Sequence, residues 1–301
     1  MAVNRYVALA VLGAIWGGTF VLITVSIRAF EPEGVLGLRM VLGALTAAPF
    51  AFALVGVRAV WESIRTLWWK MIVTAVFTFS APTLMLAWAQ ERIDSGLAGV
   101  LVAGAPLFTA LLALRFARHD TVSGLRLVGL LVGFVGVALL VGVQPSGDVL
   151  AAAVVALVGL SYAFAGLFTV RWFGETSPFV ATLGMFLLTA VVMLPISVPR
   201  LPDAMPDGKV IAAMIGLGVG CTGIGLIIYV SLVARHGMQF GVLVNYLVPA
   251  GALGYGAAFL GESITPARVG GLVLVLLGVG LGSGLLRRRP SGRTATQPQE
   301  L

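Results

Sequence analysis

Long stretches of this sequence contain no charged residue, and they limit the possible folds more than any other feature. Residues 6–27, 149–170, 179–198 and 210–234 contain no Asp, Glu, Lys or Arg. An α-helix needs about 20 mainly apolar residues to cross the hydrocarbon core of a bilayer. Charged residues make up only 10% of the 301 positions, against about 25% in soluble domains. The alternating pattern of outer-membrane strands is not seen, so the sequence predicts a helical integral membrane protein.

Ten apolar segments follow one another with short connections between them. We expect the all-α integral membrane fold to have ten transmembrane helices, at residues 6–27, 34–57, 71–90, 95–114, 127–143, 149–170, 179–198, 210–234, 238–261 and 269–286. The first segment is longer than the apolar core of a signal peptide, and we interpret it as an uncleaved span. The sequence leaves no room for a separate soluble domain.

The basic residues indicate the orientation, because Lys and Arg are enriched in cytoplasmic loops. With a cytoplasmic N-terminus, thirteen of the 19 Lys and Arg residues flank the spans on the inner side, five lie outside, and Arg39 lies within a span. We therefore expect a bacterial-type inner membrane protein with both termini in the cytoplasm. The basic tail at 287–301 contains "RRRPSGR", for which an anchor to anionic lipid is a better explanation than nucleic-acid binding.

The first half of the chain resembles the second. At a shift of 146 residues, "PEGVLGLRMVLGALTAAP" (32–49) lies over "PFVATLGMFLLTAVVMLP" (178–195), with prolines matching at both ends. Further on, "GVLVAGAP" (99–106) lies over "GVLVNYLVP" (241–249) with one inserted residue. We expect two repeats of five spans, at 1–145 and 146–286. An odd number of spans inverts the second repeat, and inverted repeats are typical of secondary transporters with a substrate site between the halves.

Glycines in spans five and ten match as well. At a shift of 142 residues, the matched positions are Gly129, Gly136 and Gly142 in span five, and Gly271, Gly278 and Gly284 in span ten. Small residues allow transmembrane helices to approach closely. Glycines on these two spans could serve contacts within one chain or between two copies, so the sequence leaves a homo-oligomer open.

These stretches resemble the ten-span EamA-like branch of the drug/metabolite transporter superfamily over nearly the whole chain. The resemblance rests on "LGAIWGGTF", "PEGVLGLRMVLGAL", "APLFTALLALRF" and above all "VPAGALGYGAAFLGESITPARVGGLVLVLLGVGL". In the first half, "FARHD" at 116–120 stands where the family has Gly-Glu. The resemblance implies two inverted five-helix bundles around a central cavity. It also implies export of small metabolites such as amino acids or nucleosides.

Proline and polar residues in span nine suggest a bendable wall of that cavity. Pro249 removes a helical hydrogen bond, and the freed carbonyl lies about one turn earlier, near Asn245. Asn245 and Tyr246 are polar at the same level, so they are candidates for substrate binding, with Pro249 as a kink. Pro106 is its counterpart in span four. An equally good explanation for any one of these residues is a packing kink with an interhelical hydrogen bond.

Other spans contain further candidates for an amphipathic cavity, which is the usual form of a small-molecule site. These candidates are Trp16 and Thr19 in span one, Trp88 and Gln90 in span three, Ser161 and Tyr162 in span six, and Tyr229 in span eight. For Trp88, an outer aromatic belt is the better explanation. Arg39 is the only ionisable residue inside a span, and such a residue is a functional candidate by default. Glu31 or Glu33 could pair with it, and a structural lock is as plausible as substrate contact.

Several functions are disfavoured by what the sequence lacks. Span one contains no acid, unlike the four-span multidrug relatives, and spans four and nine contain no lysine, which disfavours sugar-phosphate exchange. Glu262 could couple transport to protons, but a cap on span ten with Ser263 and Thr265 is the favoured interpretation. "GLSY" at 159–162 only faintly resembles a serine-protease motif, and we expect no enzyme, metal site or cofactor. The expected partners are a small-molecule substrate and the lipid bilayer. A membrane scaffold or lipid-handling protein with a dry interface between the halves is the alternative.

Overall fold

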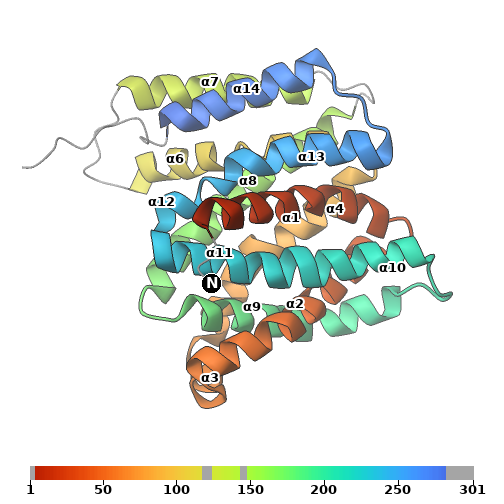
Figure 1. The fold of residues 1–301 in the computed structure, drawn as a ribbon, viewed down its shortest axis with the longest axis vertical. Helices are drawn as coiled ribbons and strands as arrows, with labels where there is room; N and C mark the ends of the chain where they lie inside the picture. The colour runs from red at the N-terminus through yellow and green to blue at the C-terminus, as the bar shows by residue number, and fades with distance from the viewer. Residues whose placement is uncertain (1–3, 117–123, 143–147, 283–301) are drawn as a thin grey trace, which may run out of the picture.

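The structure is a computed structural model that describes residues 4–116, 124–142 and 148–282. In these residues every regular element is a helix (Figure 1). The first half contains α1 (Arg5–Ser26), α2 (Pro32–Val55), α3 (Val57–Ala75), the π-helix η1 (Val76–Ser80), α4 (Ala81–Gln90), α5 (Ser95–Val102), α6 (Ala105–Phe116) and α7 (Gly124–Gly142).

The second half repeats this order with the same kinds of interruption. It contains α8 (Val149–Phe173), α9 (Pro178–Ser197), the short 3-10 helix η2 (Val198–Arg200), α10 (Gly208–Ile215), the π-helix η3 (Gly216–Ile224), α11 (Gly225–His236), α12 (Met238–Gly241), α13 (Val244–Leu260) and α14 (Pro266–Gly282). The basic tail, and most of the "FARHD" segment, lie outside the described residues.

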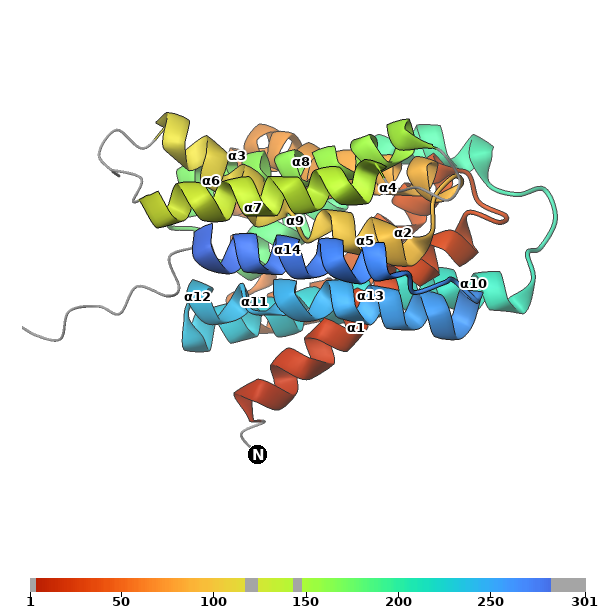
Figure 2. The same cartoon turned by 90° about the horizontal axis from the view of Figure 1, so that it is seen from above.

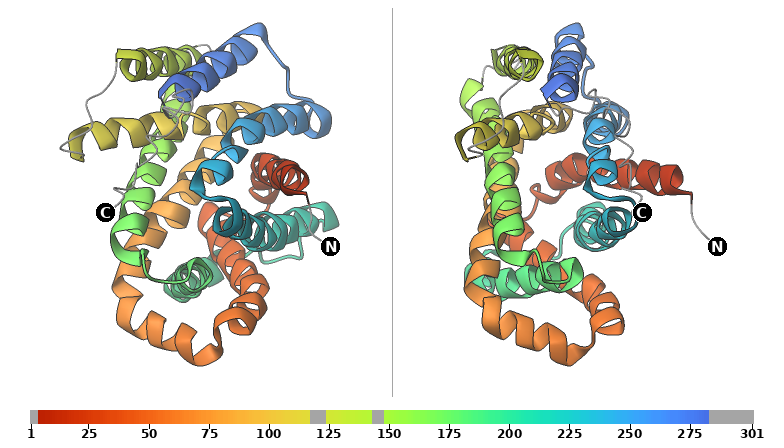
Figure 3. Two further views of the ribbon diagram at one scale, coloured as in Figure 1. Left: turned by 60° about the vertical axis from the view of Figure 1, so that its left-hand side comes forward. Right: turned by 90° about the vertical axis from the view of Figure 1, so that its left-hand side faces the viewer.

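The predicted fold class is confirmed. Within the described ranges, seven helical segments are long and apolar enough to cross a membrane, and three shorter apolar helices complete the ten spans. The shorter ones are Leu127–Val141, Val244–Leu260 and Pro266–Leu281. The helices run roughly side by side, with α7 and α14 together at one end of the molecule and α3 at the other (Figures 1 and 3). The N-terminal end of α1 extends away from the neighbouring helices (Figure 2).

The structure extends the third span toward its N-terminus. We expected a span at 71–90 with a connection before it, but a continuous helical segment runs from Val57 to Gln90. Residues 57–70 are amphipathic, with exposed Trp61, Trp68 and Trp69, and an Arg58–Glu62 pair at i,i+4 supports the helix. A search for uniformly apolar segments misses such a helix because its charged residues lower the mean hydropathy.

The contacts between the two halves are symmetric. If each span is replaced by its counterpart in the other half, the same pairs of spans are in contact. Helix α2 packs on α9 and α7 packs on α14, so each of these spans contacts its own counterpart. Helix α1 packs on α13, and the equivalent contact joins α8 to α6. At the residue level, a Cβ on Gly136 would lie 3.1 Å from the carbonyl oxygen of Gly271, and one on Gly278 would lie 2.7 Å from that of Gly129. Gly136 matches Gly278 in the repeat, and Gly129 matches Gly271. The repeat therefore converts one of these contacts into the other, as an inverted repeat requires.

Helix α1 and helix α13 approach each other at glycines. A Cβ added to Gly17 would lie 3.0 Å from the Cα atom of Gly251. Gly251 therefore allows span nine to pack closely on span one. The apolar surface groove beside this contact has a volume of about 580 Å³, and Leu247, Tyr255 and Phe259 contribute to its lining. Its apolar lining suits contact with lipid.

Candidate functional site

Arg39 joins three spans of the helical bundle. It lies two turns into α2, which begins at Pro32, a residue suited to the first turn of a helix. Its Nε donates to Thr222 Oγ1 of η3 at 2.7 Å, and its Nη1 donates to Thr83 Oγ1 of α4 at 3.1 Å. Both threonine side chains are buried, whereas Arg39 is only half-buried. Spans two, three and eight therefore meet at one guanidinium group.

The predicted pairing of Arg39 with Glu31 or Glu33 is wrong. Both carboxylates face Arg200 instead, whose Nε lies 3.3 Å from Glu31 Oε2 and 4.0 Å from Glu33 Oε2. The reason is depth, because Arg39 lies about 10 Å farther along the helix than these residues at 1.5 Å per residue. Arg200 ends η2, beside the start of α2.

The π-helix η3 exposes its backbone to span one. Trp16 Nε1 donates to the Cys221 carbonyl at 3.0 Å, and the Cys221 thiol donates to the Ile15 carbonyl at 3.2 Å. Thr19 also interacts with the Cys221 side chain. A π-turn interrupts the regular α-helical bonds, and such turns occur often at functional sites. The Trp16 ring lies 5.2 Å from that of Tyr229, so an aromatic pair stands beside η3.

The other half of the molecule contains the matching arrangement. Ser161 Oγ of α8 donates to the carbonyl of Phe77, within η1, at 2.9 Å. At the 146-residue shift Ser161 corresponds to Ile15, so spans one and six each bond to the π-helix of the opposite repeat. Tyr162, next along α8, lies within electrostatic range of Arg39. The structure therefore gathers Trp16, Thr19, Arg39, Tyr162 and Tyr229 around the two π-helices.

Trp88 and Gln90 lie at the C-terminal end of span three. The Arg92 guanidinium lies 4.2 Å from the centre of the Trp88 ring, and its Nη1 donates to the Trp88 carbonyl at 2.6 Å. Gln90 is buried and its Nε2 donates to the Phe20 carbonyl at 3.3 Å. These contacts fasten the end of the span, and their role in binding solute stays a prediction.

Span nine is broken earlier than its proline suggests. The helix is interrupted at 242–243, between α12 and α13, while Pro249 lies inside α13 and is buried. In span four the interruption at 103–104 comes directly before α6, which contains Pro106 in its first turn. Asn245 is half-buried, and its side chain forms no hydrogen bond with a described residue. The buried Tyr246 hydroxyl lies beside Gly280 of α14 and has no partner among the described atoms.

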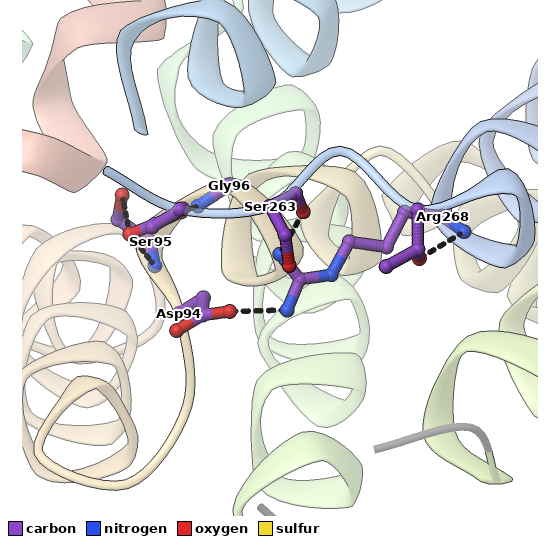
Figure 4. Close-up of polar contacts among 7 residues, drawn as sticks. Asp94, Ser95, Gly96, Ser263 and Arg268 are labelled. Carbon is purple, nitrogen blue, oxygen red and sulfur yellow. Dashed lines mark hydrogen bonds and ion pairs between the residues drawn. The ribbon is translucent and has the colours of Figure 1, made fainter. Parts of the chain in front are cut away.

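Glu262 caps a different helix from the one we expected. Its Oε1 accepts from Ser95 N at 2.7 Å and from Ser95 Oγ at 2.6 Å, and its Oε2 accepts from Gly96 N at 2.8 Å. These groups begin α5 in span four, and Figure 4 shows them with the neighbouring ion pair of Asp94 and Arg268. Span ten is capped by Thr265, whose hydroxyl accepts from the backbone of Arg268. Together these contacts form the 94–268 junction, which consists of residues 94–96 and 262–268 and joins spans four and ten.

Sequence reasoning missed several residues around Arg39 and several around Glu262 and Arg268. Thr83, Thr222 and Cys221 contact predicted residues, and Asp94 pairs with Arg268 across 174 positions of the chain. One signal was available, because a lone intramembrane arginine needs hydrogen-bond acceptors and hydroxyl-bearing residues within spans are suitable ones. Which threonines they are depends on the fold. In the part of the chain that the structure describes, no cluster of His, Cys, Asp and Glu has the form of a metal site.

Comparisons with known proteins agree with this architecture. A protein from Archaeoglobus fulgidus described as an uncharacterized transporter is 25% identical over 282 residues, which cover 92% of this chain and 97% of that one. The inner membrane transporter YedA of Escherichia coli K12 is 27% identical over 285 residues, or 93% of this chain and 84% of that one. A solved crystal structure has the same fold, with a TM-score of 0.66, 19% identity, and coverage of 96% of this chain and 100% of that one.

The family comparison covers both halves of the chain. The model of the EamA-like transporter family matches twice, at residues 4–142 and 149–283. The two matches together span more than half of the sequence, and the gap between them separates α7 from α8. The chain therefore belongs to the EamA-like transporter family and is a multi-pass membrane transporter.

Proposed function

We propose that this protein is a secondary transporter that exports small metabolites such as amino acids or nucleosides by alternating access. The observation that carries the proposal is the cluster around Arg39, to which α1, α2, α4, α8 and η3 contribute polar groups. These helices come from both repeats, and transporters with inverted repeats bind substrate at such an interface near the midplane. Rocking of one repeat against the other would then expose the cluster to each side in turn.

Corresponding spans of the two halves contain irregular segments that are suited to such a movement. Spans four and nine are both interrupted, and spans three and eight both contain a π-helix. Interrupted helices at membrane depth are tolerated where protein or a water-filled cavity surrounds them. We propose the two repeats at 1–145 and 146–286 as the moving units, and the division of the family match supports this boundary.

The proposed location is the cell inner membrane, with both termini in the cytoplasm. The asymmetric distribution of Lys and Arg supports the orientation, and the printed name of the YedA relative supports the membrane. Reporter fusions at each end provide the test. Activity of a periplasm-specific reporter at either end would contradict the orientation.

The transport proposal is tested with purified protein in vesicles. A panel of amino acids and nucleosides is loaded into proteoliposomes, and movement across the membrane is followed with and without a pH gradient. We expect at least one compound to cross faster than in protein-free vesicles. If none crosses with or without the gradient, the alternative of a membrane scaffold or lipid-handling protein becomes the better explanation.

A further inference from the structure

The Arg39 guanidinium has no anionic partner among the residues that the structure describes. It donates to two threonine hydroxyls, and no carboxylate of the described residues lies within ion-pair distance of it. The acids that the structure describes are paired or placed near the ends of spans. An unpaired charge inside a membrane protein is unfavourable, and an opposite charge nearby compensates for it. We infer that Arg39 binds the carboxylate of the transported solute, and this inference rests on the proposed transport function.

A structural arginine of the same protein looks different. Arg268 is 3% exposed, forms an ion pair with Asp94, and donates through Nη1 to the Ser263 carbonyl at 2.8 Å. Its charge is neutralised within the protein, as is usual for a buried charge. Arg39 donates to threonine hydroxyls instead, and no carboxylate of the described residues neutralises its charge. The chain pairs the buried Arg268 with a carboxylate but gives the half-buried Arg39 no such partner among the described residues, so Arg39 is suited to a ligand.

The bonding pattern of Arg39 leaves both N–H groups of Nη2 and one of Nη1 available. The Nε and Nη1 atoms hold the group against Thr222 and Thr83, while Nη2 donates to no described atom. The guanidinium has five N–H donors in a planar fork that matches a carboxylate. Two threonines on different spans fix the plane of this fork without neutralising it. Such an arrangement orients the group in advance, which lowers the cost of binding.

The surroundings define the class of solute. Tyr162 lies near the guanidinium, and the Trp16–Tyr229 pair stands beside the same π-helix as Thr222. Aromatic faces accept apolar groups and also interact favourably with cations. The site therefore fits a small solute with a carboxylate at one end, such as an amino acid or an organic acid. Uncharged nucleosides lack the group that Arg39 would recognise.

The test compares acids with their amides in wild-type proteoliposomes. The probes are L-phenylalanine, L-leucine and L-glutamine, the α-carboxamide of each, uridine and adenosine. We expect at least one amino acid to be transported, with transport of its carboxamide about 10-fold to 100-fold slower, since a hydrogen bond to a charged group contributes roughly that factor. Equal transport of the carboxamide, or transport of the nucleosides alone, would overturn the inference.

Two variants connect the selectivity to Arg39. Arg39→Gln keeps donors for the threonines without the charge, and we expect it to transport the acid at least about tenfold more slowly. Arg58→Gln removes an arginine on α3 that is exposed and lies outside the cluster, and it should behave as wild type. The acid should also raise the unfolding temperature of the wild-type protein and leave that of Arg39→Gln unchanged. Wild-type rates in Arg39→Gln would contradict the inference.

Failure of the inference differs from failure of the proposed function. Transport without preference for a carboxylate overturns only the role of Arg39, whereas an inactive wild-type protein with the whole panel contradicts transport of these metabolites. If Arg39→Gln does not fold, the comparison of acid with carboxamide in the wild-type protein still decides the question.

Discussion

Glu262→Ala is expected to lower the free energy of unfolding by about 3 kcal/mol, because three hydrogen bonds to one carboxylate are lost. The donors are Ser95 N, Ser95 Oγ and Gly96 N, and Ser95 is fully buried, so water cannot replace the carboxylate easily. The start of α5 would keep unpaired N–H groups, which is the usual penalty for removing a helix cap. Thermal unfolding in detergent measures the effect as a loss of several degrees.

Glu91→Ala is the matched control for this variant. Glu91 is exposed and pairs with the equally exposed Arg92 at 3.0 Å. Exposed ion pairs contribute about 0–1 kcal/mol, so this substitution should hardly change the unfolding temperature. A Glu262→Ala protein as stable as Glu91→Ala would show that the 94–268 junction does not hold the fold together.

The same carboxylate allows the coupling role to be tested separately. Glu262→Gln keeps the size of the side chain and an oxygen that accepts hydrogen bonds, but it cannot exchange a proton. If Glu262 is only a cap, dependence of transport on the pH gradient should be the same in Glu262→Gln and in the wild-type protein. Loss of that dependence in a folded Glu262→Gln protein would assign the coupling role to this residue.

Gly278→Ala is expected to destabilise the contact between spans five and ten by about 1–3 kcal/mol, the usual cost of forcing an extra methyl group into a packed site. The added Cβ would collide with the backbone of Gly133 and lie 2.7 Å from the carbonyl oxygen of Gly129. Backbone atoms cannot turn away as a flexible side chain can, so α14 would have to separate from α7. The unfolding temperature in detergent is the measurement.

Gly270, on the same helix, is the matched control. A Cβ at Gly270 meets nothing within 4 Å. Alanine there should raise stability by up to about 1 kcal/mol, because it favours the helix more than glycine does. Equal effects at the two positions would contradict close packing of α14 on α7. Gly278 packs against Gly129 and Gly133 within one chain. These glycines therefore give no support to a homo-oligomer, which stays a proposal.

Hydropathy and repetition in the sequence were enough to predict the architecture. The length of an apolar segment is a local property, and the matched glycines and prolines report the repeat directly. The helix at 57–70 was missed because it is amphipathic, and the break at 242–243 was missed because it precedes Pro249 by two turns. Local sequence does not show which of several glycines and prolines interrupts a helix.

The candidate site was only partly predictable. Arg39 was found because a charge within a span is rare, and Trp16 and Tyr162 because polar aromatic residues stand out in an apolar helix. Their partners could not be assigned, because Thr222 meets Arg39 across 183 positions and Glu262 meets Ser95 across 167. Such contacts depend on how the inverted halves pack, which no local pattern contains.

The proposed alternating access requires a water-accessible pathway that reaches Arg39. Thiol labelling at Thr83 tests this requirement most directly. The protein has one cysteine, so Cys221→Ser gives a background in which Thr83→Cys and, as a control, Leu45→Cys are each labelled by a charged maleimide. Maleimides react with the thiolate, which forms where water reaches the sulfur. Leu45 is 66% exposed on α2 within the predicted lipid region. We predict labelling of Thr83→Cys, beside Arg39, and none of Leu45→Cys; an unreactive Thr83→Cys in a folded protein would contradict the pathway and favour a dry interface between the halves.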